Sequence, residues 1–168
     1  MKKIGIIALA LAMLMLTAAF TACNGGSGNS NKIVANVTIS ISTPDGLIVE
    51  RQVTVEGTAE VPPTVLDAAK LALDIMKQEE GNDKLDYDLE YDKDDNPVRF
   101  NSITDTDGNV YKYGALDEEA TLYGLWDFTV DGVEAEVGMA ATPVAEGQTI
   151  NMVYSTITAE ELAASSGK

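Results

Sequence analysis

The sequence predicts an α+β domain in which a mixed β-sheet packs on one amphipathic helix. Three observations lead to this fold class: a hairpin pattern at the start of the folded region, one stretch of helical periodicity, and a later series of short alternating runs separated by turn residues. One apolar helix face needs one sheet to cover it, so this order of elements favours a sheet that wraps the helix.

The chain begins with the features of a signal peptide. Lys2 and Lys3 precede an almost unbroken apolar run, residues 4–16, which is too short to span a bilayer. Small residues then lead to Cys23, the only cysteine of the sequence. We expect a lipoprotein signal peptide over residues 1–22; the alternative is an ordinary signal peptide followed by an unpaired thiol.

Residues 20–23, FTAC, resemble the lipobox of bacterial lipoproteins, in which the cysteine is acylated and becomes the new N-terminus. The resemblance implies that Cys23 carries lipid such as palmitate and holds the protein at the extracytoplasmic face of the cell membrane. Residues 23–32 are rich in Gly, Ser and Asn and are expected to form the flexible tether behind this anchor.

Charge and composition exclude several classes of function. Without residues 1–22 the chain keeps 9 basic and 27 acidic residues, a formal charge of −18, which repels nucleic acid. The sequence has no histidine and no second cysteine, so it lacks His-based general bases, thiolate metal sites and Cys–His nucleophiles. We therefore expect no enzyme, no resident cofactor and no metal. Paired carboxylates such as Asp86 with Asp88, or Glu118 with Glu119, leave a glycosidase as the enzymatic alternative.

The folded domain is expected over residues 33–157 and opens with a β-hairpin. Apolar and polar residues alternate over residues 33–41, a Thr-Pro-Asp-Gly turn follows, and residues 47–55 form the return strand. On this second strand the alternation places Leu47 on the core face with the valines that follow it. Residues 158–168 are expected to be a tail, either one helical turn or no structure.

One helix is predicted over residues 65–79. Thr64 is suited to cap its first turn, and Asp67 stands at the third position of a capping box. The apolar residues recur at helical spacing and are expected to face the core: Val65, Leu66, Ala69, Ala72, Leu73 and Met76.

Short strands are predicted over residues 85–91, 98–104 and 110–113. The first is acidic, which favours a position at the edge of a sheet. Residues 105–109 place acidic and amide side chains at alternate positions, as a calcium loop does, but Leu116 stands where such a loop needs glutamate. A hairpin turn is the better interpretation.

The stretch from Tyr123 to Tyr154 contains the only tryptophan. Its first apolar run, residues 125–130, ends at Asp131-Gly132, the dipeptide that best fits a two-residue hairpin turn, and a last alternating run covers residues 149–154. This stretch predicts three strands, and the complete order of elements is that of a β-grasp domain.

Three segments resemble the transcobalamin-like C-terminal domain family: residues 64–69, the tryptophan strand with its Asp131-Gly132 turn, and residues 146–150. The resemblance covers residues 34–155. In the animal vitamin B12 carriers this β-grasp domain caps the corrinoid while a separate helical barrel holds the other face; most bacterial members of the family have no known function. We expect no such barrel in the sequence, and its Gly138-Met139-Ala140-Ala141 lacks the acid that ends the family's Gly-aliphatic-Ala-Asp segment.

The resemblance implies a lipid-anchored solute-binding module, with a cobalamin-like corrinoid as ligand and a membrane transporter as recipient. The residues it implies at the ligand are Tyr123, Trp126, Phe128, Gly138, Met139 and Ala140. Trp126 has a structural alternative, in which it fills the core over the helix. The functional alternative is a cell-surface module that binds a protein or glycan at an open sheet edge, for which residues 85–91 and 98–104 are the candidates.

Overall fold

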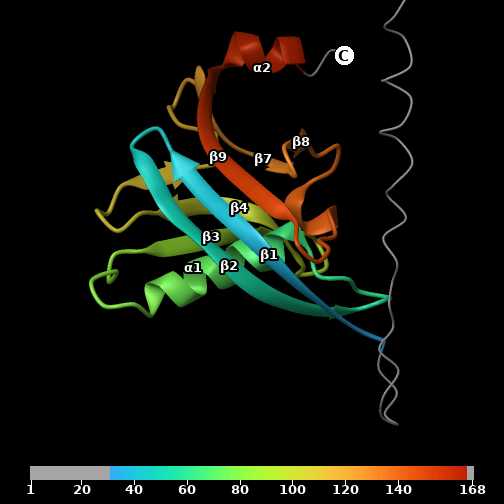
Figure 1. Ribbon diagram of the computed structural model, residues 1–168. Helices are drawn as coiled ribbons and strands as arrows, with labels where there is room; N and C mark the ends of the chain where they lie inside the picture. Colours follow the sequence, from blue (N-terminus) through green and yellow to red (C-terminus); the bar gives the residue numbers. More distant parts are fainter. Residues whose placement is uncertain (1–30, 166–168) are drawn as a thin grey trace, which may run out of the picture.

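The computed structural model describes residues 31–165, which form two β-sheets around one main helix (Figure 1). The predicted signal peptide, most of the tether and Cys23 lie outside the described residues. The larger sheet has six strands: β1 (Lys32–Thr43), β2 (Gly46–Thr58), β6 (Gly114–Ala115), β7 (Leu122–Val130), β8 (Val133–Glu134) and β9 (Thr149–Thr158). The smaller sheet has three: β3 (Asp86–Tyr91), β4 (Pro97–Thr104) and β5 (Val110–Lys112). The helical elements are α1 (Val65–Lys77), the 3-10 turn η1 (Met139–Ala141) and α2 (Ala159–Ser165).

The larger sheet is mixed, as predicted. Its strand order is β2-β1-β9-β7-β6, with β8 paired to β7, and the central β1–β9 pair is parallel while the other pairs are antiparallel. The first and last strands of the domain therefore lie side by side in the middle of the sheet (Figure 1).

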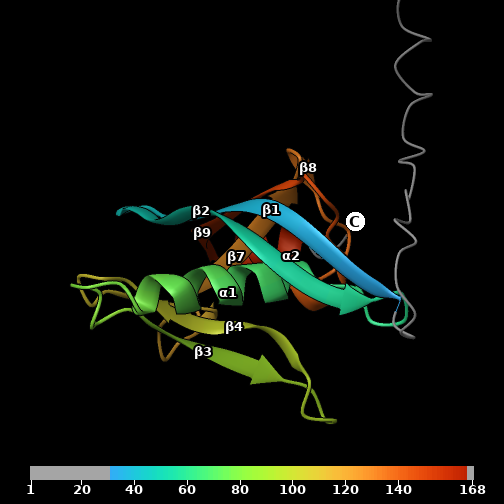
Figure 2. The ribbon, with the colours of Figure 1, turned by 60° about the horizontal axis from the view of Figure 1, so that its bottom comes forward.

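Helix α1 lies between the larger sheet and the β3–β4 hairpin (Figure 2). It packs on β2 and β1 along its apolar face. On the other side the Tyr87 hydroxyl donates to Asp74 Oδ1 of the helix at 2.7 Å, and the Tyr87 ring meets Phe100 edge-on. The predicted α+β fold, a sheet around one amphipathic helix, is confirmed.

The first hairpin follows the predicted alternation, with one difference. On β1 the odd-numbered apolar residues from Ala35 to Ile41 are buried and the even-numbered residues face outward. The register shifts between Ile41 and Ser42, so that Ile48 and Val49 are both buried while Leu47 is 58% exposed. The prediction that Leu47 faces the core was wrong, because a β-bulge resets the alternation that the sequence pattern assumes to be constant.

The capping box of α1 forms as predicted. Thr64 Oγ1 accepts the Asp67 N–H at 3.3 Å, and Asp67 Oδ2 accepts the Thr64 N–H at 2.9 Å. Two backbone donors that the helix leaves unpaired are thereby satisfied. The helix ends at Lys77, two residues earlier than predicted.

The core fills the space between the helix and the two sheets. Its largest fully buried apolar side chains come from every layer: Phe100, Ile39, Ile41, Leu66, Leu73, Leu85, Ile103, Ile150 and Met152. Each buried side chain of this size stabilises the fold by about 1.5–3 kcal/mol relative to an exposed one. In the part of the chain that the structure describes, no buried polar or charged residue interrupts this core.

The C-terminal part is more regular than predicted. Strand β9 continues to Thr158, four residues beyond the predicted run, and α2 follows it directly. Across residues 31–165, neither α1 nor α2 has the length and apolar composition of a bilayer-spanning helix.

Candidate functional site

A shallow pocket lies where β7, β8 and β9 meet, and the positions of these strands can be followed in Figure 1. Its volume is about 340 Å³, at the small end of the range for small-molecule sites, about 300–1,000 Å³. Six residues line it: Asp127, Phe128, Thr129, Glu134, Asn151 and Val153. A pocket of this size holds one small ring and not a large macrocycle.

The strand register brings the lining side chains together. Thr129 on β7 lies directly opposite Asn151 on β9 and opposite Glu134 on β8, so these three residues form a row across three strands. Asp127 lies opposite Val153 in the next row. Alternate residues of a strand share one face, and these positions belong to the set that points away from the core, unlike Met152 and Tyr154. The pocket is therefore on the outer face of the larger sheet.

The Asp131-Gly132 turn holds the β8 hairpin beside β9. Both residues have positive φ, 53° and 79°, as a two-residue hairpin turn with the twist of the strands requires. Asp131 also binds β9 twice: its N–H donates to the Thr149 carbonyl at 2.7 Å, and its Oδ1 accepts the Thr149 N–H at 2.8 Å. The turn predicted from the sequence is confirmed, and these two bonds fix one wall of the pocket.

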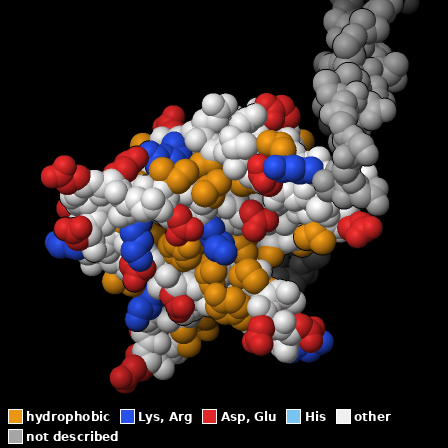
Figure 3. All heavy atoms as spheres, turned by 90° about the horizontal axis from the view of Figure 1, so that it is seen from below, with side chains coloured by type: hydrophobic (Ala, Val, Ile, Leu, Met, Phe, Trp, Pro, Cys, Tyr) orange, Lys and Arg blue, Asp and Glu red, His pale blue; other side chains and the backbone are white. Residues whose placement is uncertain are grey.

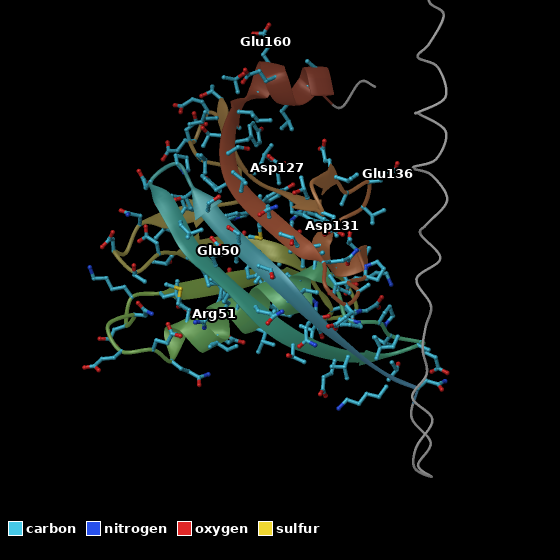
Figure 4. The ribbon with its side chains drawn as sticks, viewed as in Figure 1. Glu50, Arg51, Asp127, Asp131, Glu136 and Glu160 are labelled. Carbon is cyan, nitrogen blue, oxygen red and sulfur yellow. The ribbon has the colours of Figure 1, made fainter. Side chains whose placement is uncertain are left out.

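The pocket is acidic and rich in hydrogen-bond acceptors. Asp127 Oδ2 accepts the Ser155 hydroxyl at 2.9 Å, which holds this carboxylate in place. The side chains of Thr129, Glu134 and Asn151 make no hydrogen bond to any residue in the range 31–165. None of the six lining residues is basic. Figure 4 shows Asp127, Asp131 and Glu136 on the β7–β8 side of the sheet, which adds to the negative field there.

Trp126, the most prominent predicted residue, faces the core. It is 7% exposed, and its ring centroid lies 4.9 Å from that of Tyr154 and 6.5 Å from that of Tyr111. Tyr154 donates its hydroxyl to the Lys112 carbonyl at 2.9 Å, which fixes the aromatic cluster of Tyr111, Trp126 and Tyr154 against β5. Trp126 Nε1 is buried without a hydrogen-bond partner in the described chain. The structural alternative, a tryptophan that fills the core, matches this placement.

The other predicted residues are dispersed. Phe128 is half-buried and lines the pocket, while Tyr123 is half-buried beside β6 and opposite Ile157. Gly138 is exposed at the start of η1, and Ala140 is half-buried.

Met139 is 4% exposed and belongs to the core, because η1 packs against α1 and β4. The structure thus brings one of the six predicted residues, Phe128, to the pocket. Whether any of the six contacts a ligand stays a prediction.

Five lining residues were missing from the sequence prediction: Asp127, Thr129, Glu134, Asn151 and Val153. The signal for four of them was present. The alternation of residues 125–130 and 149–154 places odd-numbered positions on one face, but the sequence does not show that β7 and β9 are neighbours. Glu134 reaches the pocket only because β8 folds back on β7 in a hairpin.

The acidic loop at residues 105–109 is a turn that uses its own carboxylate. Asp105 Oδ1 accepts the backbone N–H groups of residues 107, 108 and 109 at 2.8–2.9 Å, and Oδ2 accepts from Asn109 and the Tyr111 hydroxyl. Burial opposes ionisation of Asp105, but these hydrogen bonds outweigh it and lower the pKa of its carboxyl. Among the described residues no three acidic side chains converge as metal ligands.

Tyr111 joins this loop to the first hairpin. Its hydroxyl shares its one proton between two carboxylates, Asp45 Oδ2 at 2.8 Å and Asp105 Oδ2 at 3.1 Å. Burial, together with these two carboxylates, raises the pKa of Tyr111 to about 12. The ends of the two sheets are tied together at this residue.

The sheet edges differ from the prediction in one respect. Strand β3 is an edge of the smaller sheet, as its acidity suggested, but β4 lies between β3 and β5. Residues 102–104 of β4 pair on both sides, with β3 and with β5, so this segment is not an open edge.

No protein-family model matches the sequence, and no curated protein matches it. Among solved structures the chain is similar to haptocorrin in complex with Cbi, at 15% identity and a TM-score of 0.43, over 80% of this chain and 28% of the haptocorrin chain. It is also similar to a Ruminococcus gnavus protein proposed to bind metal, at 15% identity and a TM-score of 0.33, over 72% of this chain and 96% of that chain. The chain thus spans just over a quarter of the length of haptocorrin. Likenesses at this level assign no ligand to this protein.

Proposed function

We propose that this chain is a lipid-anchored, extracytoplasmic solute-binding module whose ligand site is the pocket between β7, β8 and β9. The observation that carries the proposal is the row of Thr129, Glu134 and Asn151, three polar side chains that converge in a cavity and have no hydrogen-bond partner in residues 31–165. Free donors and acceptors in a pocket with an apolar wall are the pattern of a ligand site.

A corrinoid is the solute that the resemblance to the transcobalamin-like domains suggests. A corrin ring is much larger than a pocket of about 340 Å³, so the pocket would hold one of its peripheral amide arms. Such an arm can donate to Asp127 or Glu134 and pair with the Asn151 amide. The ring would then cover the mouth of the pocket, and a second protein would cover its other face. In this proposal the module passes the solute to a membrane transporter, and it binds without catalysis.

Equilibrium dialysis of the purified full chain against cobinamide and cyanocobalamin tests this ligand. We expect retention by the natural chain and at least a tenfold weaker retention by Val153→Trp, which fills the pocket from a side chain that is 46% exposed. Gln52→Ala, on the edge strand β2 and outside the pocket, is the matched control. Equal retention by Val153→Trp would place any bound corrinoid elsewhere.

The lipid anchor has its own test. We expect Cys23→Ser to abolish labelling by a fatty acid and to release the chain from the membrane fraction. If the serine variant stays in the membrane and labels like the natural chain, the lipoprotein proposal is wrong.

A second function, a surface interaction module, is favoured by the open edge of β3. No described strand pairs with its far side, so its backbone groups can accept a strand from a partner. Seen from below, apolar side chains gather on the face that carries α1, with charged side chains around them (Figure 3). The exposed large apolar residues of these two elements are Ile75 and Tyr91. Leu89→Pro, in the middle of β3, should abolish capture of such a partner, and unchanged capture would argue against this edge.

A further inference from the structure

The unpaired groups of the pocket are suited to hydroxyl groups of a ligand. Glu134 offers two free carboxylate oxygens, and Asp127 offers one oxygen besides the one bound to Ser155. Between them Asn151 and Thr129 can both donate and accept. A ligand hydroxyl that donates to a carboxylate forms a charge-assisted bond, which is stronger than a neutral one.

The charge of the pocket selects against anions. Both of its ionisable lining residues, Asp127 and Glu134, are acidic, and no Lys or Arg lies among the six. Asp131 and Glu136 lie on the same side of the sheet (Figure 4). A phosphate or carboxylate would meet only repulsion there, so the ligand is neutral or cationic.

The spacing of the polar row suits one sugar ring. Side chains directly opposite on neighbouring strands are about 5 Å apart, so Asn151, Thr129 and Glu134 can each reach a different hydroxyl of the same ring. The volume of about 340 Å³ accommodates such a ring.

The pocket also has an apolar part, which a simple cation site would not need. Val153 lies opposite Asp127 on the outer face of the sheet and is 46% exposed, so its methyl groups are open to a ligand. The C–H groups of a sugar ring can pack on the Val153 side chain while its hydroxyls point to the polar row. Val153 thus favours a sugar over a polyamine, which has no comparable ring face.

We infer that this pocket binds a neutral saccharide, with Asn151, Thr129 and Glu134 receiving its hydroxyls and Val153 packing against its ring. This inference rests on the proposed function, because it names a ligand class for the same pocket. It differs from the corrinoid proposal in the group that enters the pocket, a hydroxylated ring in place of an amide arm.

Backbone amide spectra of the isotope-labelled full chain in detergent micelles test this inference. The probes are the methyl glycosides of glucose, galactose and mannose, with cobinamide, spermidine and citrate as comparisons. We expect at least one glycoside to give saturable shifts at Thr129, Asn151 and Val153, and citrate to give none. Asn151→Ala should weaken this glycoside about tenfold, the equivalent of one lost hydrogen bond to a charged or amide group.

Gln52→Ala is the matched control for Asn151→Ala, because it removes an amide from an exposed strand position outside the pocket. Its affinity for the glycoside should equal that of the natural chain. Asn151 is itself exposed and makes no contact that the fold needs, so the spectrum of its variant should otherwise stay unchanged.

The outcomes separate the inference from the proposed function. Shifts at the pocket with cobinamide or spermidine, but with no glycoside, would overturn the saccharide inference and keep a solute site. No shift at the pocket with any probe would overturn the solute-binding proposal itself. Glycoside shifts that Asn151→Ala leaves undiminished would overturn the assignment to this row.

Discussion

Gly124→Ala should destabilise the domain strongly, because Gly124 on β7 lies very close to Lys112 at the end of β5. A Cβ atom at this position would overlap the Lys112 carbonyl oxygen and the Tyr154 hydroxyl, and would lie 2.9 Å from Tyr154 Cζ. Real Cβ atoms essentially never come within 3.0 Å of such atoms. The backbone oxygen cannot rotate away, so β5 or Tyr154 must move by about 1 Å.

The cost follows from what that movement breaks. Overpacking of this kind costs about 1–3 kcal/mol. Displacement of Tyr154 also weakens its 2.9 Å bond to the Lys112 carbonyl, about 0.5–1.5 kcal/mol, and loosens its contact with Trp126. We expect the free energy of unfolding to fall by about 3 kcal/mol, and the melting temperature of a domain this size by roughly 10 °C.

Gly138→Ala is the matched control. Gly138 has φ −65°, which alanine adopts freely, and a Cβ there meets nothing within 4 Å. This variant should be as stable as the natural chain or slightly more stable. Urea unfolding followed by Trp126 fluorescence measures both variants. If Gly124→Ala unfolds within about 0.5 kcal/mol of Gly138→Ala, the close approach of β5 and Tyr154 to this position is wrong.

Three further predictions concern the cap, one phenol and one carboxylate. Thr64→Ala should lower the free energy of unfolding by about 1 kcal/mol in urea, because it removes the cap acceptor of α1, whereas Thr64→Ser should keep most of it. Burial and the two nearby carboxylates raise the pKa of Tyr111 from its ordinary 10.0 to about 12, so its contribution to stability is complete below pH 10.0 and is lost as the pH rises towards 12. Tyr111→Phe should remove this alkaline loss, and an unchanged pH profile would contradict the raised pKa. Hydrogen bonds from the backbone N–H and the side-chain amide of Asn36 lower the pKa of the Glu146 carboxyl. The stability that Glu146 contributes is therefore present above its ordinary pKa of 4.5 and is lost as the pH falls through the lowered pKa. Glu146→Gln should destabilise the domain at neutral pH but not in acid, which urea unfolding midpoints measured from neutral to acidic pH would test.

The sequence predicted the order of the main elements because their signals are local. The capping box at Thr64, the apolar stripe of α1 and the Asp131-Gly132 turn each depend on residues that are close together in the sequence. The exposed Leu47 was missed because a β-bulge is not visible in an alternating pattern.

The pocket could not be predicted for a different reason. Asn151 and Thr129 become neighbours through the β7–β9 pairing, and Glu134 joins them through the β8 hairpin. Composition singled out Trp126, a rare and large residue, but the same size and apolarity that make it conspicuous also place it in the core. The residues of the pocket are common polar residues, and they form a site only because the pairing of the strands brings them together.

The parallel pairing of β1 with β9 has a consequence for how the protein reaches its final structure. Ser40 pairs with Asn151, so the centre of the larger sheet joins chain segments more than a hundred residues apart. Until the last twenty or so residues of the domain are available, β1 and β7 lack their common neighbour and the sheet has a gap in its middle. Contacts of such long sequence separation form slowly, because loop closure must precede them. The larger sheet can therefore close only once β9 is available, and a chain cut before Thr149 would leave β1 and β7 without a neighbour at the centre of the sheet.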